Sequence, residues 1–182
     1  MSSLLENKSR AMSKTSLMIT KYFNKGLLIN ILFILFIFLA DRISKIYIIN
    51  LDKKFLGSEI FSSKFLNLNL IWNEGIAFGL LSFNESSLYN FLTTLIGLVI
   101  LVIFFISMKS DRLRKYSLLM ILGGALGNFF DRVKTKAVPD FIDFHIGNFH
   151  WFIFNVADIF ITLGVIFLII LEFIDSKENI KI

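Results

Sequence analysis

Five aspartates stand beside long apolar runs in this chain, and their type and spacing decide what chemistry it can perform. They are Asp41, Asp131, Asp140, Asp143 and Asp158. The surrounding sequence is strongly apolar, since 55% of its 182 residues are hydrophobic and 22 are Phe. An ionised carboxylate at membrane depth costs about 2.5–3.5 kcal/mol, so such groups usually face a protein interior or a wet cavity. We interpret the stretch from Gly123 to Gly164, which holds four of the five, as an intramembrane reaction centre.

Paired carboxylates are the main reagents that this composition offers. The chain has no cysteine and two histidines, His145 and His150, which excludes thiolate nucleophiles and leaves little for a Ser-His-Asp triad. Two aspartates confined in one site cannot both ionise easily, so one keeps its proton. The ionised partner can activate a water molecule while the other donates to a carbonyl oxygen, and a peptide bond is hydrolysed. We expect no metal and no other cofactor.

Three other interpretations compete with this one. Ser44 beside Lys45 resembles a serine–lysine dyad, but adjacent helical residues point about 100° apart, which disfavours a hydrogen bond between them. The aspartates could instead form structural ion pairs with Arg42, Lys45 and Arg132. They could also line a proton or cation pathway of a small membrane transporter. A transporter needs polar residues on the cytoplasmic half of its path, and the apolar runs hold none there.

Composition places the chain in a membrane. A mean hydropathy of +0.72 with only 18% charged residues does not suit a soluble domain of this size. The net charge of +5 comes from basic residues at the ends of apolar runs, which follows the positive-inside rule. We therefore expect membrane lipid as a partner and no nucleic acid.

The apolar runs predict an all-α membrane protein with four transmembrane helices. The expected spans are approximately 26–49, 86–108, 116–132 and 152–174, between cytoplasmic tails at 1–25 and 175–182. The basic N-terminal segment and the basic loop at 109–115 place both termini in the cytoplasm. Spans one and three then carry their polar residues late and span four carries them early. All three polar clusters therefore fall in the outer half of the membrane.

Two connections between the spans carry patterns of their own. Leucines alternate with asparagines over residues 66–70, which predicts a strand and a small extracytoplasmic β-sheet between the first and second helices. Between the third and fourth helices, Gly147-Asn148 is flanked by apolar runs, as in a hairpin turn. That hairpin would fold Asp140 back towards Asp158.

Four blocks of sequence, in order along the chain, resemble the lipoprotein signal peptidases, or type II signal peptidases. The blocks are DRISK at 41–45, NEGIAFG at 73–79, GGALGNFFDR at 123–132 with VPDF at 138–141, and FNVAD at 154–158. The resemblance covers roughly residues 27–174. It implies that Asp140 and Asp158 are the catalytic pair. It also implies that the remaining block residues line and support the substrate cleft: Asp41, Lys45, Asn73, Gly75, Asn128, Asp131, Arg132 and Asn155.

The resemblance further implies the reaction and its place. The enzyme would be a monomeric aspartyl endopeptidase of the bacterial cytoplasmic (inner) membrane, with its active site on the extracytoplasmic side. Its substrates would be diacylglyceryl-modified prolipoproteins, cut just before the lipidated cysteine. The loop at 73–81, with Gly75 and Gly79 as hinges, is a candidate lid. The chain departs from the family's usual pattern at Arg42, at Pro139 and in the proline-free run at 151–154.

Overall fold

The computed structural model describes residues 25–75, 86–110 and 112–179, which fall into two units. The first unit contributes residues 25–33, the beginning of helix α2 (Lys25–Lys54). The second unit begins at Ile34 and contains the rest of α2 together with every other element described below. The site that concerns us lies wholly in this second unit.

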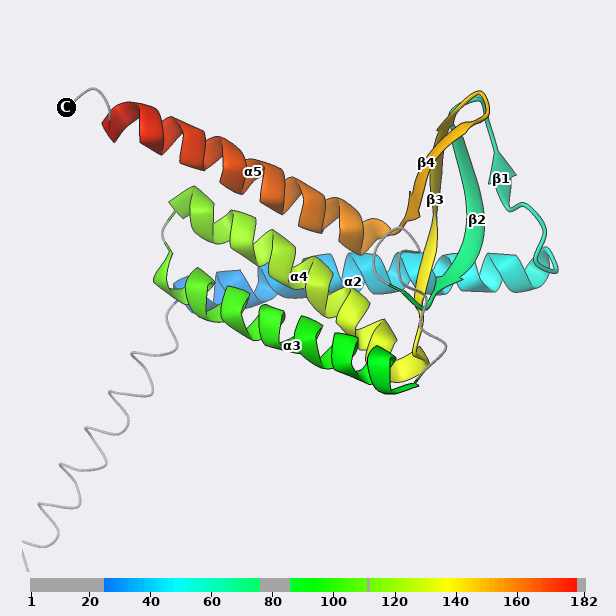
Figure 1. Ribbon diagram of the computed structural model, residues 1–182, viewed down its shortest axis with the longest axis horizontal. Helices are drawn as coiled ribbons and strands as arrows, with labels where there is room; N and C mark the ends of the chain where they lie inside the picture. Colours follow the sequence, from blue (N-terminus) through cyan, green and yellow to red (C-terminus); the bar gives the residue numbers. More distant parts are fainter. Residues whose placement is uncertain (1–24, 76–85, 111, 180–182) are drawn as a thin grey trace, which may run out of the picture. The chain divides into compact units, whose positions relative to one another are not determined.

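Three further helices and a sheet complete the second unit (Figure 1). The helices are α3 (Ser86–Lys109), α4 (Arg112–Thr135) and α5 (Val156–Asn179). Helix α4 is the central one, because it contacts each of the others through small or aromatic residues. It meets α2 at Gly123, α5 at Gly124, and α3 where the Phe129 ring lies 3.2 Å from the position of a Cβ added at Gly97.

Glycines allow α4 and α5 to approach closely at two points. A Cβ added at Gly124 would lie 2.5 Å from the Ala157 carbonyl oxygen, and one added at Gly164 would lie 2.6 Å from the Ser117 carbonyl oxygen. Both obstacles are helix backbone, which cannot rotate away as a side chain can. The contact at Gly124 also fixes the N-terminal turn of α5, where Asp158 lies.

We predict that Gly124→Ala lowers the free energy of unfolding by about 1–3 kcal/mol, because the added methyl group overpacks the α4–α5 contact. Thermal or denaturant unfolding in detergent, followed by circular dichroism, measures the change. Gly26→Ala is the matched control, since no heavy atom lies within 4 Å of a Cβ added there. Equal stability of the two variants would show that the helices can separate without cost.

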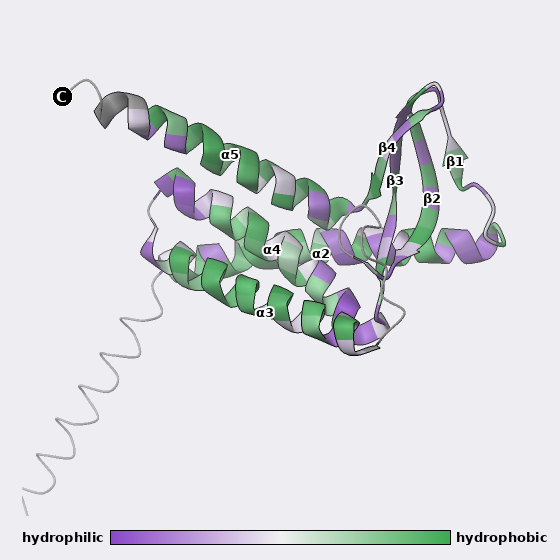
Figure 2. Cartoon of the chain, in the orientation of Figure 1, coloured by the Kyte–Doolittle hydropathy of each residue, from purple (hydrophilic) through white to green (hydrophobic). Residues whose placement is uncertain are grey.

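The helices differ in what their apolar residues face. Three of the described helical segments are long and apolar enough to cross a membrane: Lys25–Lys54, Ser87–Lys109 and Val156–Ser176. Figure 2 shows α3 and α5 as hydrophobic over most of their length, whereas α4 has hydrophilic residues at both ends. Helix α4 is not among the three, and its apolar middle is largely buried, as at Leu119 and Leu122. The chain is thus a multi-pass membrane protein in which α4 forms the core.

One antiparallel sheet of four strands lies where α4 ends and α5 begins (Figure 1). Its strands, in spatial order, are β1 (Phe61–Ser62), β2 (Leu66–Asn73), β3 (Val138–Ile146) and β4 (Phe149–Phe154). The strand predicted at 66–70 and the hairpin predicted at Gly147-Asn148 are both confirmed, and Gly147 has a φ of 59°. The small sheet predicted between the first two helices is present, but it is larger than predicted, because the connection between α4 and α5 adds two strands to it next to the site.

The burial of β2 differs from the alternation in its sequence. The leucines at 66, 68 and 70 are only half-buried, whereas Asn67 is buried. The reason is a polar network: Asn67 Nδ2 donates to Asp143 Oδ2 at 3.4 Å, and Ser62 Oγ donates to Asn67 Oδ1 at 2.9 Å. Period two identified the strand, but it did not identify the buried face.

Helix α5 begins at Val156 rather than near Phe152. Residues 152–154 complete β4 instead, and Asn155 separates strand from helix. This short junction places the end of the sheet and the first turn of α5 next to each other.

Candidate active site

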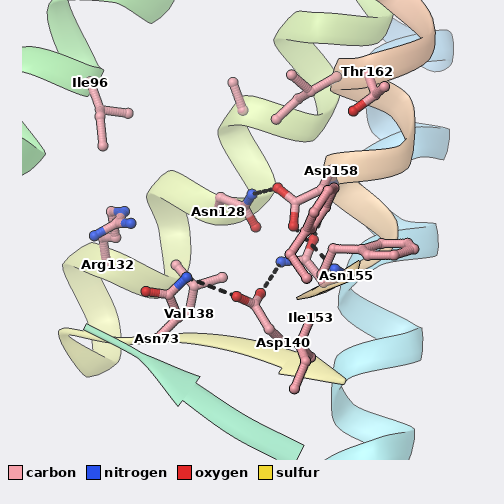
Figure 3. A pocket seen from close by; sticks show the side chains of 14 residues that line it. Asn73, Ile96, Asn128, Arg132, Val138, Asp140, Ile153, Asn155, Asp158 and Thr162 are labelled. Carbon is pink, nitrogen blue, oxygen red and sulfur yellow. Dashed lines mark hydrogen bonds between the residues drawn. The ribbon is translucent and has the colours of Figure 1, made fainter. Parts of the chain in front are cut away.

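Asp140 and Asp158 line one cavity of about 350 Å³ between the helices and the sheet. Figure 3 shows both carboxylates with the side chains of Asn73, Asn128 and Asn155 around them. The remaining lining is mostly apolar and comes from α3, α4, α5 and the two hairpin strands: Ile96, Ala125, Val138, Phe152, Ile153, Phe154 and Ile161. The cavity therefore joins a small polar centre to a larger apolar region.

Asp158 is positioned by the N-terminal cap of α5. Asn155 is the capping residue: its Oδ1 accepts from the Asp158 N–H at 3.2 Å, and its own N–H donates to Asp158 Oδ2 at 3.1 Å. This reciprocal pair is a capping box, with Asp in the place of the usual Glu. The Ala157 N–H, another free donor of the first turn, donates to Asp41 Oδ1 at 3.1 Å. The FNVAD block is thus a helix start that aims Asp158 into the cavity.

Asp140 is positioned by strand β3, in register with Ile71 of β2. Its carboxylate is buried and accepts from Asn73 Nδ2 at 2.9 Å on one oxygen and from Asn155 Nδ2 on the other. Burial raises the pKa of Asp140 to about 6, and the nearby Asp158 charge adds to that rise against the opposing effects of the asparagine amides and Lys45. Asp140 therefore keeps a proton at a pH where an exposed aspartate has lost it.

Three asparagines surround the two carboxylates, and each is fixed in orientation by a second contact. Asn128 accepts from Lys45 Nζ at 2.7 Å and donates to Asp158 Oδ1 at 2.8 Å. Asn73 Oδ1 accepts from the Gly75 N–H at 3.0 Å, which turns its amide nitrogen towards Asp140. Asn155 is fixed in the same way by the Asp158 N–H. Since each carbonyl oxygen already has a donor, each NH2 group is presented to a carboxylate.

A buried cluster of four charges lies behind Asn128. Asp41 and Lys45 come from α2, one helical turn apart, and Asp131 comes from α4. Lys45 is 1% exposed, and its three donors reach Asp41 at 3.0 Å, Asp131 at 2.8 Å and Asn128 at 2.7 Å. Arg42 is the fourth member and binds both oxygens of Asp131. Asp41 and Lys45 are therefore both an ion pair and part of the wall behind the site.

Arg132 and Gly75 meet at the edge of the cavity. Arg132 Nη2 donates to the Gly75 carbonyl oxygen, and its guanidinium lies 5.9 Å from the centre of the Tyr89 ring. The Tyr89 hydroxyl in turn donates to the Arg132 carbonyl oxygen at 3.2 Å. Gly75 is thus held at its N–H by Asn73 and at its carbonyl by Arg132, so the NEG sequence contributes to the site through the Asn73 side chain and the Gly75 backbone.

Two residues singled out by sequence lie outside this arrangement. Asp143 is buried in the sheet, where it contacts His150 Nδ1 at 2.8 Å, so one of the five aspartates does not belong to the centre. Ser44 donates to the Asp41 carbonyl oxygen at 2.8 Å and does not contact Lys45 Nζ among the described hydrogen bonds, so no serine–lysine dyad forms. Most of the candidate lid at 73–81, including Gly79, lies outside the described residues.

From sequence, Arg42 was considered only as a partner in a structural ion pair and not as a site residue, and none of the apolar lining was named. Arg42 belongs to the DRISK block, but a charge in the last third of a predicted span is common, and only the partners of Arg42 in the structure distinguish it. No group of three or more His, Cys, Asp or Glu within the described residues is placed to hold a metal ion.

Family models and curated relatives of this chain agree on one family. The family model described as "Signal peptidase (SPase) II" matches residues 33–174. A lipoprotein signal peptidase of Pelagibacter ubique is 50% identical over 159 residues, covering 86% of this chain and 96% of its own length. One from Anaplasma marginale is 38% identical over 150 residues, covering 81% and 86%.

Solved structures show the same fold. A bacterial membrane enzyme determined by the in meso method at 2.3 Å resolution matches with a TM-score of 0.66 and 30% identity, covering 82% of this chain and 90% of that one. A second, at 1.9 Å, matches with a TM-score of 0.64 and 34% identity, covering 78% and 90%.

Proposed function

Since this chain belongs to the signal peptidase II family, we propose that Asp140 and Asp158 are the catalytic pair of its proteolytic reaction. The chain is an aspartic-type protease that removes signal peptides from prolipoproteins. The observation that carries the proposal is the meeting of two carboxylates from different elements in one cavity. Asn155 bridges them, because its side-chain NH2 donates to Asp140 and its backbone N–H donates to Asp158 Oδ2.

The two carboxylates take different roles. Asp158 accepts on both oxygens at the N-terminal turn of α5, where the helix dipole favours negative charge. It acts as the general base on a water molecule that attacks the scissile carbonyl carbon. Asp140 keeps its proton through burial and donates it to the carbonyl oxygen as the tetrahedral intermediate forms. The three asparagines hold both carboxylates in place while this proton moves.

We also propose a substrate and a membrane arrangement, which the cavity lining and the helix lengths support. The apolar lining of the cavity suits a diacylglyceryl-modified cysteine, with the cut just before that residue. Helix α4 has 24 residues, which span about 36 Å at 1.5 Å each, so it is long enough to serve as the third of four spans. Both termini are then cytoplasmic, with tails at 1–25 and 175–182. The site faces the extracytoplasmic side of the inner membrane, and the enzyme works as a monomer.

Cleavage of defined precursors tests this function. The purified enzyme in phospholipid vesicles is given one prolipoprotein in two forms, with and without diacylglycerol on the cysteine, and products are identified by mass spectrometry. We expect cleavage of the modified form only, immediately before the cysteine. Equal cleavage of both forms would contradict the proposed lipid requirement, and absence of cleavage by folded enzyme would contradict the proposed function.

The raised pKa of Asp140 makes a prediction about pH. A group with a raised pKa holds its proton below that value and loses it above, so kcat/KM should fall as pH rises through about 6. The kcat profile should fall at a higher pH, because bound substrate excludes remaining water from the carboxyl group and favours its neutral form. Initial rates measured from about pH 4 to about pH 9, roughly two to three units either side of the Asp140 pKa, give both profiles. A kcat/KM that rises through pH 6 would instead assign Asp140 as the base.

A further inference from the structure

Arg42 lies well inside helix α2 (Lys25–Lys54), and it contacts more of the buried charges than a residue paired only with its own helix would. Its Nη1 and Nη2 bind the two oxygens of Asp131, and Nη2 also reaches Asp41 Oδ2 at 2.8 Å and the Gly127 carbonyl oxygen at 3.3 Å. Its side chain is 14% exposed, and the guanidinium carbon lies 5.1 Å from the centre of the Phe130 ring. Arg42 is thus held rigidly against α4, and its position depends on Asp131.

The charges of the cluster balance only when Arg42 is included. Asp41 and Asp131 supply two negative charges, and Lys45 and Arg42 supply two positive ones. Removing Arg42 would leave two buried carboxylates with the single ammonium group of Lys45. Buried charges without a partner are strongly unfavourable, so Lys45 would be drawn towards the two carboxylates.

Lys45 also makes a third hydrogen bond, to Asn128, which this shift would disturb. Its remaining donor holds Asn128 Oδ1, and that contact turns Asn128 Nδ2 towards Asp158. An Asn128 side chain without its lysine could rotate its amide and present its carbonyl oxygen to the carboxylate. The chain of contacts therefore runs from Arg42 through Asp131, Lys45 and Asn128 to Asp158.

We propose that Arg42 is a positioning residue of the proteolytic site, which neutralises the Asp41–Asp131 carboxylates so that Lys45 can hold Asn128 in the orientation that donates to Asp158. This inference rests on the proposed catalytic pair. It assigns Arg42 no contact with substrate, and it separates Arg42 from a purely structural ion pair by predicting effects on the chemistry of the site.

The charge balance also acts on Asp140 directly. Asp140 faces Asp158 from α5, Lys45 from α2 and Arg132 from α4. Losing one positive charge from the cluster favours the neutral form of Asp140, so the pH at which kcat/KM falls should increase. Losing one negative charge, as in Asp131→Asn, should decrease it. A residue that only stabilises the fold would change neither midpoint.

The test compares Arg42→Gln with wild type in cleavage of a diacylglyceryl-modified prolipoprotein in phospholipid vesicles. We expect kcat per folded enzyme to fall about 10–100-fold with KM within about twofold, because the carboxylate is misplaced rather than substrate binding lost. The kcat/KM midpoint near pH 6 should rise by about half to one pH unit. Arg114→Gln is the control, since Arg114 forms exposed pairs with Glu172 and Asp175 at the opposite end of α4.

Variants that restore or change the charge balance give the most direct test, and they can still be measured if Arg42→Gln alone does not fold. The double variant Arg42→Gln/Asp131→Asn restores neutrality, so its pH midpoint should return to that of wild type, while Asp131→Asn alone should move the midpoint down. A midpoint that stays unchanged in Arg42→Gln or Asp131→Asn, or a double variant whose midpoint does not return, would overturn the role of Arg42. Cleavage by Asp140→Asn would instead overturn the catalytic pair itself, so the two failures are distinguishable.

Discussion

Asp140→Asn and Asp158→Asn are each expected to lower kcat for prolipoprotein cleavage by at least about 10³-fold, because each removes one half of the proton transfer. Asparagine keeps the size of aspartate and can still accept a hydrogen bond, so the site should keep its shape. Single-turnover cleavage of a diacylglyceryl-modified prolipoprotein measures the loss without interference from product release. The double variant should be scarcely slower than either single variant, since the two residues act as a unit.

Two other aspartates serve as matched controls for this loss. Asp131→Asn disturbs the cluster behind Asn128 but leaves both reacting groups. It should therefore retain part of the activity, about a tenth of the wild-type kcat. Asp143 lies in the sheet beside His150 and away from the cavity, so Asp143→Asn tests whether loss of any buried carboxylate is sufficient to stop cleavage. If Asp140→Asn still cuts while Asp131→Asn does not, Asp131 is the partner of Asp158.

Local sequence signals were enough to predict the elements that carry Asp140 and Asp158, the proposed catalytic pair. The hairpin at Gly147-Asn148 follows from turn chemistry that acts within a few residues, and it brings β3 and β4 together. That Asp140 would fold back towards Asp158 followed from this hairpin alone, and Figure 3 shows the two side chains on the same cavity. The assignment of these two as catalytic came instead from the resemblance of whole blocks.

What could not be predicted depends on contacts between distant segments. The joining of β2 to β3 pairs Asn67 with Asp143, 76 positions apart, and that polar contact reverses the expected buried face of β2. The end of β4 at Phe154 and the start of α5 at Val156 are likewise set by a cap, whereas hydropathy alone extends the apolar run through both. Periodicity reports which residues are apolar, but the partners of polar residues decide which of them are buried.

The same reasoning explains why Arg42 and Lys45 could not be ranked from sequence. Both residues lie in the last third of an apolar run. Lys45 follows Asp41 by four residues, and that spacing indicates only a local ion pair. Their distinct roles depend on Asp131 and Asn128 of α4, more than 80 residues away. Helix packing, which glycines at 123, 124 and 127 permit, determines which of these charges meet.

Lys45→Met is expected to lower the free energy of unfolding by about 3–5 kcal/mol, because it leaves the buried Asp41 and Asp131 carboxylates with Arg42 as their one remaining cation among the described ion pairs. Methionine preserves an unbranched side chain of similar length, so the loss of charge and of three hydrogen bonds dominates over any change in packing. Denaturant unfolding in mild detergent, monitored by circular dichroism, measures the effect.

The loss should extend to catalysis as well as stability. Without Lys45, Asn128 Oδ1 loses the hydrogen bond that orients its amide, so kcat of the folded fraction should fall about 10–100-fold. Lys53→Met is the matched control, since Lys53 is an exposed lysine in the last turn of the same helix. A stability of Lys45→Met within about 1 kcal/mol of that control would mean that Arg42 alone can compensate both carboxylates. In that event the buried cluster would contribute to the fold without depending on Lys45, and the orientation of Asn128 would have to come from its own helix.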